Sequence, residues 1–158
     1  MSRPRRLEHF SYLGPALYFL TFCTHDRRTT FVESSVFDAT IREFRNVAAR
    51  ESFAILAYCF MPDHAHLLVE ELKESSDLRR FVKLMKQHSG AAYALRTGQP
   101  LWQEGYYDRV LREEEDAKEV ARYILNNPVR AGLVTTPSEY PYLGSEVWSL
   151  EELLGSLI

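Results

Sequence analysis

Apolar residues along the chain follow two different periods. Nearly continuous apolar and β-favouring runs over 16–24, 53–61 and 64–70 predict three strands. A short proline-containing turn joins the second of these runs to the third, so we expect those two strands to pair in antiparallel. Segments 34–50 and about 76–95 instead carry apolar residues at helical spacing, which predicts two amphipathic helices.

The remaining elements complete a recognisable order. Segment 106–112 is expected to form a fourth strand. Acidic residues at 113–116 stand where a helix dipole favours negative charge, so a third helix should begin there and end near Asn127, because Pro128 follows. The order predicts an α+β fold: a ferredoxin-like (RRM-like) antiparallel sheet with helices on one face, plus an additional C-terminal helix.

The length limits how many domains this pattern can form. A chain of 158 residues can bury one sizeable core but is too short for two ordinary domains. We therefore expect a single domain over 1–158, with its core over about 12–142, a basic arm over 1–11 and an acidic tail over 143–158.

Charge is distributed unevenly along the chain, although the formal net charge is only −3. Residues 79–112 contain seven basic and two acidic side chains, whereas the part from Glu113 onward contains three basic and nine acidic ones. A basic stretch is more often a solvated helix face than a binding surface, so charge alone leaves a nucleic-acid partner open.

Cysteine content and hydropathy indicate where the protein works. Cys23 and Cys59 lie far apart in apolar runs, with none of the paired spacing that indicates a zinc or redox site, so we expect a reduced, cytoplasmic protein. No long apolar segment follows the basic N-terminus, so neither a signal peptide nor a membrane partner is expected.

His64 and His66 are the first candidates for chemistry. Alternate residues of a strand point to the same face, with Cα atoms about 6 to 7 Å apart, so the two imidazoles could bind one divalent cation. Ala65 between them should face the core under the helices. Two histidines on the solvated face of a sheet would give the same pattern, so the spacing alone leaves both interpretations open.

Tyr123 and Asn127 supply what the histidine pair lacks. They are one helical turn apart on the third predicted helix and could approach the histidines together, the phenol as a nucleophile and the amide oxygen as a third metal ligand. Tyr123 could equally be a packing residue of an amphipathic helix, and Asn127 could simply end the helix before a proline.

Four sequence segments, in a fixed order along the chain, resemble those of a known family. They are the strand-turn-strand 58–69 (YCFMPDHAHLLV), the stretch 101–109 (LWQEGYYDR), the helix with Tyr123, and the segment 126–134 (NNPVRAGLV). Together they resemble the HUH single-tyrosine transposases, and in particular the REP-associated subgroup, over roughly 12–142.

The resemblance implies roles for these residues. It implies that His64, His66 and Asn127 hold a divalent metal, Mg²⁺ or Mn²⁺, and that Tyr123 attacks a DNA phosphodiester to give a 5′-phosphotyrosine. A tyrosine hydroxyl is a poor nucleophile at neutral pH, so metal assistance is expected. Relatives usually carry Gln where Asn127 stands.

The resemblance also implies single-stranded or hairpin DNA as the partner. The residues expected to contact DNA are basic or aromatic: Arg3, Arg5, Arg6, Arg79, Lys83, Lys86, Trp102, Tyr106, Tyr107 and Arg109. Two other functions stay open, a DNA-binding module without cleavage and a metal-dependent phosphodiesterase. Simpler relatives exchange the tyrosine helix between subunits, whereas a monomer that docks Tyr123 on its own sheet is favoured here.

Overall fold

The structure is a computed structural model, and it describes residues 16–112 and 114–155. Its centre is a five-stranded sheet with the order β4-β1-β3-β2-β5, in which every neighbouring pair is antiparallel. The strands are β1 (Leu17–Cys23), β2 (Phe53–Met61), β3 (His64–Glu71), β4 (Tyr107–Val110) and β5 (Leu143–Gly144). The first four strands have the ferredoxin-like order, which confirms the fold class predicted from the periodicity.

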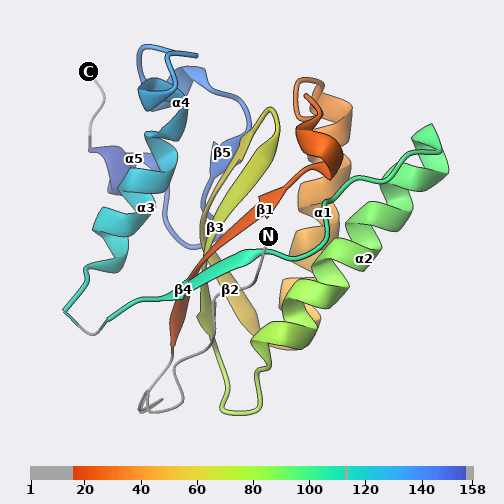
Figure 1. Ribbon diagram of the computed structural model, residues 1–158. Coiled ribbons are helices and arrows are strands. Elements are labelled where there is room, and N and C mark those ends of the chain that lie inside the picture. Colours follow the sequence, from red (N-terminus) through yellow and green to blue (C-terminus); the bar gives the residue numbers. More distant parts are fainter. Residues whose placement is uncertain (1–15, 113, 156–158) are drawn as a thin grey trace.

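Helices cover both faces of this sheet (Figure 1). The longer ones are α1 (Ser34–Glu51), α2 (Leu78–Thr97) and α3 (Ala117–Leu125), and the shorter ones are α4 (Asn127–Arg130), α5 (Leu150–Leu154), η1 (His25–Arg27) and η2 (Pro137–Glu139). Helices α1 and α2 lie on one side, and α3, α4 and α5 lie on the other (Figure 1). In the described part of the chain, no helix is both long and apolar enough to cross a bilayer.

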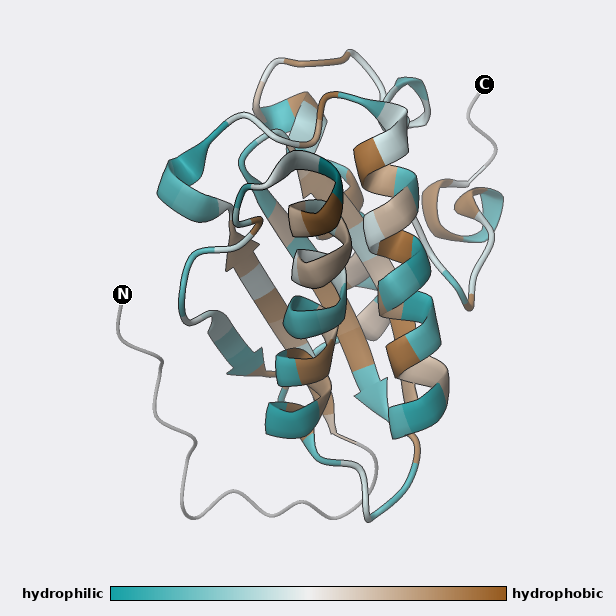
Figure 2. Cartoon of the chain, turned by 90° about the vertical axis from the view of Figure 1, so that its right-hand side faces the viewer, coloured by the Kyte–Doolittle hydropathy of each residue, from teal (hydrophilic) through white to brown (hydrophobic). Residues whose placement is uncertain are grey.

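The alternation of side chains along each strand divides the core into two clusters. Ala65, Leu67 and Val69 of β3 are fully buried in the cluster beneath α1 and α2. Leu68, on the opposite face of the same strand, is buried in the cluster beneath α3. Figure 2 shows the two long helices side by side in front of the sheet, with many hydrophilic residues on their outer surface. The strand period therefore assigns His64 and His66 to the α3 face.

Helix ends follow local capping chemistry. The side chain of Asp77 accepts hydrogen bonds from the backbone N–H groups of Arg79 and Arg80 at the start of α2, and Gly98 ends that helix in the left-handed conformation. Asp116 caps α3 in the same way, by accepting from the N–H of Lys118. The helix was predicted to begin at the acidic residues 113–116, and it begins at Ala117, with the last of these residues, Asp116, as its cap.

The end of α3 differs from the prediction. The helix ends at Leu125, and a further short helix, α4, begins at Asn127 with Pro128 in its first turn. Proline is tolerated there because the first-turn N–H groups of a helix have no intrahelical acceptor. The amide nitrogen of Asn126 donates to the carbonyl oxygen of Arg122 at 2.8 Å, which closes the end of α3. Tyr123 and Asn127 therefore lie on two consecutive helices, and the prediction that one helix carries both is wrong.

Residues 143–155, which were expected to belong to an acidic tail, pack on the core. Leu143 lies in β5, which pairs with β2, and Leu153 of α5 is 1% exposed against α3. The Nε of Arg122 donates to the carbonyl oxygen of Leu153 at 2.6 Å and fastens α5 to α3. The acidic residues face outward while their apolar neighbours extend the core, so the prediction that 143–158 lies outside the core is wrong for these described residues.

Candidate functional site

The two histidines of β3 lie side by side on the α3 face of the sheet. Their ring centroids are 4.7 Å apart, and both residues are partly buried, whereas Ala65 between them is fully buried on the other face. The same-face prediction for His64 and His66 is therefore confirmed as geometry. In the sheet register His66 stands opposite Thr21 of β1 and Cys59 of β2, so the pair occupies the middle of the sheet.

Each imidazole is oriented through its Nδ1 atom. The Nδ1 of His64 lies 2.7 Å from Oδ1 of Asp63, and the Nδ1 of His66 lies 2.9 Å from Oγ1 of Thr21. Asp63 is held in turn by Arg27, whose Nε and Nη2 lie 3.1 and 3.0 Å from its Oδ2. A carboxylate behind an imidazole accepts its Nδ1 proton and leaves the Nε2 lone pair for a ligand, as in metal centres where a carboxylate orients a histidine.

The protonation states suit this role. Burial acts to raise the pKa of Asp63, but hydrogen bonds from His64 and Arg27 outweigh it and hold that pKa below its ordinary value. Burial, followed by the charges of His64 and Arg130, lowers the pKa of His66 to about 4, so this ring is neutral at physiological pH. Burial raises the pKa of the Cys59 thiol to about 12, which makes this neighbour a poor metal ligand.

A divalent cation fits this donor set with open coordination positions. No described residue hydrogen-bonds to the Nε2 atom of either ring, so both remain available. Within 16–112 and 114–155 there is no group of three or more His, Cys, Asp or Glu side chains that could hold a metal ion. A cation here would therefore take two imidazoles from the protein and complete its coordination with amide, phosphate or water oxygens, as catalytic sites do.

Tyr123 lies at a cavity on the same face of the sheet. Tyr123 is 58% exposed, whereas its neighbours Ile124 and Leu125 are fully buried beneath α3. The cavity has a volume of about 430 Å³ and is lined by Phe19, Arg109, Glu119, Val120 and Tyr123. The ring of Phe19 contacts that of His66, with centroids 5.4 Å apart. Phe19 thus forms a shared wall between the Tyr123 cavity and the histidine pair.

Arg130 is the residue of this site that sequence reasoning missed. Its guanidinium carbon lies 3.8 Å from the ring centroid of Tyr123, and its charge also acts on His66 and Cys59. Arg130 follows Tyr123 by two helical turns, a spacing that would place both on one face of a continuous helix. This spacing could have predicted that the two side chains lie together, but the third helix was expected to end near Asn127, before Arg130.

Asn127 lies at the first position of α4, between Tyr123 and Arg130 in the chain. It is partly exposed, and its side-chain amide makes no hydrogen bond to any described residue. Its amide group therefore has no partner that competes with a metal ion, and its assignment as a third ligand stays a prediction.

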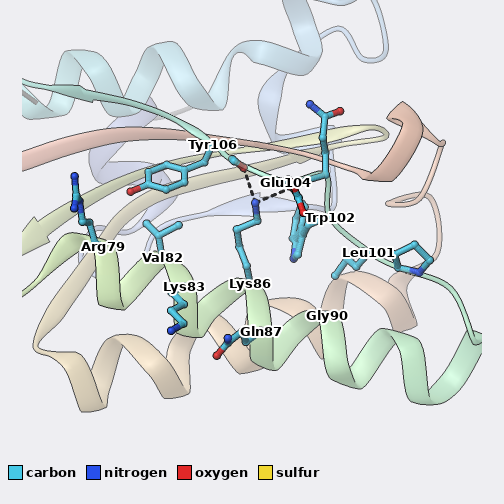
Figure 3. A pocket seen from close by; sticks show the side chains of 13 residues that line it. Arg79, Val82, Lys83, Lys86, Gln87, Gly90, Leu101, Trp102, Glu104 and Tyr106 are labelled. Atoms are coloured by element: carbon cyan, nitrogen blue, oxygen red, sulfur yellow. Dashed lines mark hydrogen bonds between the residues drawn. The ribbon is translucent and has the colours of Figure 1, made fainter. Parts of the chain in front are cut away.

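The predicted DNA-contacting residues separate into two groups. Arg109 lines the Tyr123 cavity. Its Nη1 atom donates to the two carboxylate oxygens of Glu115, at 2.8 and 2.9 Å. Tyr107 lies two residues before Arg109 on β4 and stands opposite Thr21 of β1. The other described residues of the set line a second cavity beside α2, on the other face of the sheet (Figure 3): Arg79, Lys83, Lys86, Trp102 and Tyr106. Arg3, Arg5 and Arg6 lie outside the described residues.

Known proteins resemble this chain in sequence and in fold. A family model described as "Transposase IS200 like" matches residues 15–127. A Haemophilus influenzae protein named as a REP-associated tyrosine transposase is 27% identical over 143 residues, which cover 80% of this chain and 77% of that protein. A REP-associated tyrosine transposase of Escherichia coli is 22% identical over 131 residues, covering 83% of this chain and 77% of that protein.

One solved structure extends the likeness to three dimensions. It shows a REP-associated tyrosine transposase bound to a REP hairpin, and it aligns with this chain at a TM-score of 0.75 and 23% identity. The alignment covers 90% of this chain and 82% of the other, so the two proteins share a fold.

Proposed function

Because the chain belongs to the IS200-like transposase family, in which its relatives are REP-associated tyrosine transposases, we propose that it cuts and rejoins single-stranded DNA beside a hairpin, with Tyr123 as the nucleophile. One observation carries this proposal: the ring of Phe19 lines the cavity of an exposed tyrosine and also contacts His66, one of two oriented imidazoles on the same face of the sheet. A hairpin is proposed as the DNA because the structurally similar transposase is bound to one.

The chemical step is an in-line exchange at phosphorus. The hydroxyl oxygen of Tyr123 attacks the scissile phosphate and loses its proton, and the bond from phosphorus to the 3′-oxygen breaks. The departing oxygen takes a proton and becomes a free 3′-hydroxyl, while the 5′-phosphate stays on Tyr123. One phosphodiester replaces another, so a second 3′-hydroxyl can reverse the step without ATP.

The charged side chains around Tyr123 prepare this attack. Arg130 stacks on the phenol ring, which holds the ring in place and puts a positive charge beside the attacking oxygen and the phosphate. The Nη1 of Arg109 donates to both carboxylate oxygens of Glu115, and a phosphate that enters the cavity can replace this carboxylate as the acceptor.

His64 and His66 would hold a divalent metal, Mg²⁺ or Mn²⁺, with Asn127 as the candidate third ligand, and that ion would supply Lewis-acid polarisation of a phosphate oxygen. Asp63 and Thr21 position the two rings for this purpose. Helix α3 packs on β2 and β3 of its own chain, so the arrangement supports a monomer that assembles the site in cis.

A denaturing gel tests the proposal. End-labelled oligonucleotides that carry a hairpin with randomised single-stranded flanks are incubated with the protein and Mn²⁺. A covalent protein–DNA adduct supports the proposed chemistry, cleavage without an adduct indicates a hydrolase, and binding without cleavage indicates a DNA-binding module. Tyr123→Phe should abolish the adduct, whereas Tyr107→Phe, the matched change on β4, should leave a covalent adduct that maps to Tyr123.

A further inference from the structure

The cavity on the α1 and α2 face is not part of the Tyr123 site. It has a volume of about 570 Å³ and lies between α2 and the extended segment 100–106 that leads into β4. We call it the α2 groove, and its principal lining residues are Arg79, Lys83, Lys86, Gly90, Trp102 and Tyr106 (Figure 3). Trp102 and Tyr106 pack on the core beneath α1 and α2, whereas α3 covers the other core cluster. The sheet therefore separates the two cavities.

One wall of the α2 groove is cationic. Arg79, Lys83 and Lys86 follow one another at intervals of about one helical turn, so they line the same side of α2. Arg79 and Lys83 make no ion pair with any described residue. Glu104 contributes one carboxylate to the lining, so the cations outnumber it by three to one. An anion of more than one charge would complement this wall.

Lys86 is fixed in the groove. Its Nζ atom donates to the carbonyl oxygens of Gln103, at 2.8 Å, and Gly105, at 2.5 Å (Figure 3). These bonds join α2 to the opposite wall and hold the ammonium group at a defined place. Since an ammonium group has three N–H donors, one remains for a ligand.

The floor of the groove is aromatic and packs closely on the core. The indole of Trp102 packs against the rings of Phe22, Phe31 and Phe44, and its Nε1 donates to the hydroxyl of Ser89 at 2.9 Å. The Tyr106 ring contacts Phe22 edge-on, with centroids 6.1 Å apart. A preformed aromatic floor beside a cationic wall is the combination that binds an unpaired nucleotide, its base against the floor and its phosphate against the wall.

A glycine keeps this floor open. Gly90 lies inside α2, where glycine is less favourable than alanine, and its backbone has no positive φ that would require glycine. A Cβ atom at this position would meet nothing within 4 Å, so no neighbouring group excludes a side chain. The effect of glycine at position 90 is to leave space along the groove for another molecule.

The edge of the sheet connects the groove to the Tyr123 cavity. Among the residues that the structure describes, β4 pairs with β1 alone and forms the edge of the sheet. Tyr106, just before β4, lines the groove, and Arg109 of β4 lines the Tyr123 cavity on the opposite face. These two residues are separated by about 10 Å of extended chain. A single strand of DNA that passes over this edge can occupy both cavities.

We infer that the α2 groove binds an unpaired nucleotide of the single-stranded DNA that continues from the Tyr123 site over the β4 edge. This inference rests on the proposed function for its choice of DNA over a free nucleotide. The cationic wall holds the phosphates on either side of the nucleotide, and the aromatic floor takes the base without selecting strongly for its identity. The groove would thus hold the strand that Tyr123 cuts.

Tryptophan fluorescence tests the inference directly. The chain has two tryptophans, so Trp148→Phe leaves Trp102 as the only reporter. Titration of that protein with a ten-residue oligothymidylate in EDTA should quench Trp102 saturably. Three phosphate-binding cations predict a slope of about −2 in a plot of log affinity against log salt concentration.

Gly90→Leu supplies the decisive variant, because it fills the groove without removing a charge or a packing group. It should weaken oligothymidylate binding at least tenfold. Ala91→Leu places the same side chain at the next, exposed position of α2, outside the groove lining, and should change the affinity less than twofold. Melting temperatures of both variants verify that α2 is intact.

Absence of quenching, or equal affinities for the two leucine variants, would overturn the inference. Binding of thymidine monophosphate as tight as that of the oligonucleotide would also overturn it, since the groove would then be a small-molecule site. Adduct formation by the wild-type protein is measured separately. An adduct without Trp102 quenching refutes the groove and keeps the proposed function, whereas quenching without an adduct supports the groove and refutes covalent cleavage.

Discussion

Replacing Arg130 with glutamine isolates the electrostatic part of the proposed mechanism. The side chain of Arg130 has one described contact, the stack on the ring of Tyr123, and the substitution keeps a polar side chain while removing the charge. The backbone of α4 should be unaffected, because its hydrogen bonds do not involve this side chain. Any loss of cleavage then reports on the charge of Arg130, which lies beside Tyr123 and also acts on His66, and not on the fold.

The size of the effect follows from the distance. Two unit charges about 4 Å apart interact by about 1 kcal/mol in water and about 4 kcal/mol at the effective dielectric near a protein surface. The guanidinium carbon lies 3.8 Å from the centroid of the Tyr123 ring, so charge that develops on the phenol oxygen or the phosphate is expected at a comparable distance; Tyr123 is 58% exposed, which places the environment between these limits. A loss of about 1 to 3 kcal/mol of transition-state stabilisation corresponds to a rate of adduct formation about 5 to 150 times slower.

Single-turnover adduct formation is the assay, with an oligonucleotide on which the wild-type protein forms an adduct. DNA affinity is measured in parallel by fluorescence anisotropy in EDTA, and it should fall much less than the rate. Arg130→Lys keeps the charge but lacks the planar group that stacks on the ring, so its rate should be intermediate. Arg42→Gln, an exposed change on α1 across the sheet, controls for loss of a positive charge anywhere on the surface.

A rate for Arg130→Gln within twofold of wild type, with the melting temperature unchanged, would refute this reasoning. A fall in affinity that matches the fall in rate would assign Arg130 to ground-state DNA binding instead.

Three further outcomes are expected. Asp63→Asn should raise the Mn²⁺ concentration for half-maximal adduct formation about 10- to 100-fold, since it no longer orients His64; an unchanged Mn²⁺ titration would contradict that role. Mixing a His64→Ala, His66→Ala double variant with Tyr123→Phe should not restore adducts, because α3 packs on its own sheet, and recovery would show exchange between subunits. Phe81→Ala should lower the free energy of unfolding by about 3 to 5 kcal/mol in denaturant titrations, because this buried ring stacks on another phenylalanine at 4.2 Å; a loss below about 1 kcal/mol would show that the site collapses around the change.

Local periodicity was enough for most of the fold. Runs of apolar residues predicted β1, β2 and β3, and helical spacing predicted α1 and α2. With the expected fourth strand and third helix, their order gave the ferredoxin-like arrangement. The short strand β5 and helix α5 were not predicted. Each has only a few residues, and acidic neighbours surround the apolar side chains, such as Leu153, that pack on the core. A charge count cannot separate such a segment from a solvated tail.

Some relations within the candidate site could also be predicted from the sequence, and others needed the structure. The sequence by itself determined that His64 and His66 share one face, because this relation depends only on the period of the strand. It placed Tyr123 and Asn127 on one helix, whereas the structure places them on the consecutive helices α3 and α4. The stacking of Arg130 on Tyr123 needed the three-dimensional path of the chain through Pro128.

Only the tertiary structure decided which of the basic and aromatic residues act together. One continuous basic stretch of sequence supplies Arg109 to the Tyr123 cavity and Lys86 to the α2 groove, on opposite faces of the sheet. The physical reason is that the period of a strand or helix specifies which side chains share a face. The packing of elements distant in sequence determines which other residues each face contacts. Strand β4 joins the sheet beside β1, and this pairing, made between residues far apart in the chain, places one cavity on each side.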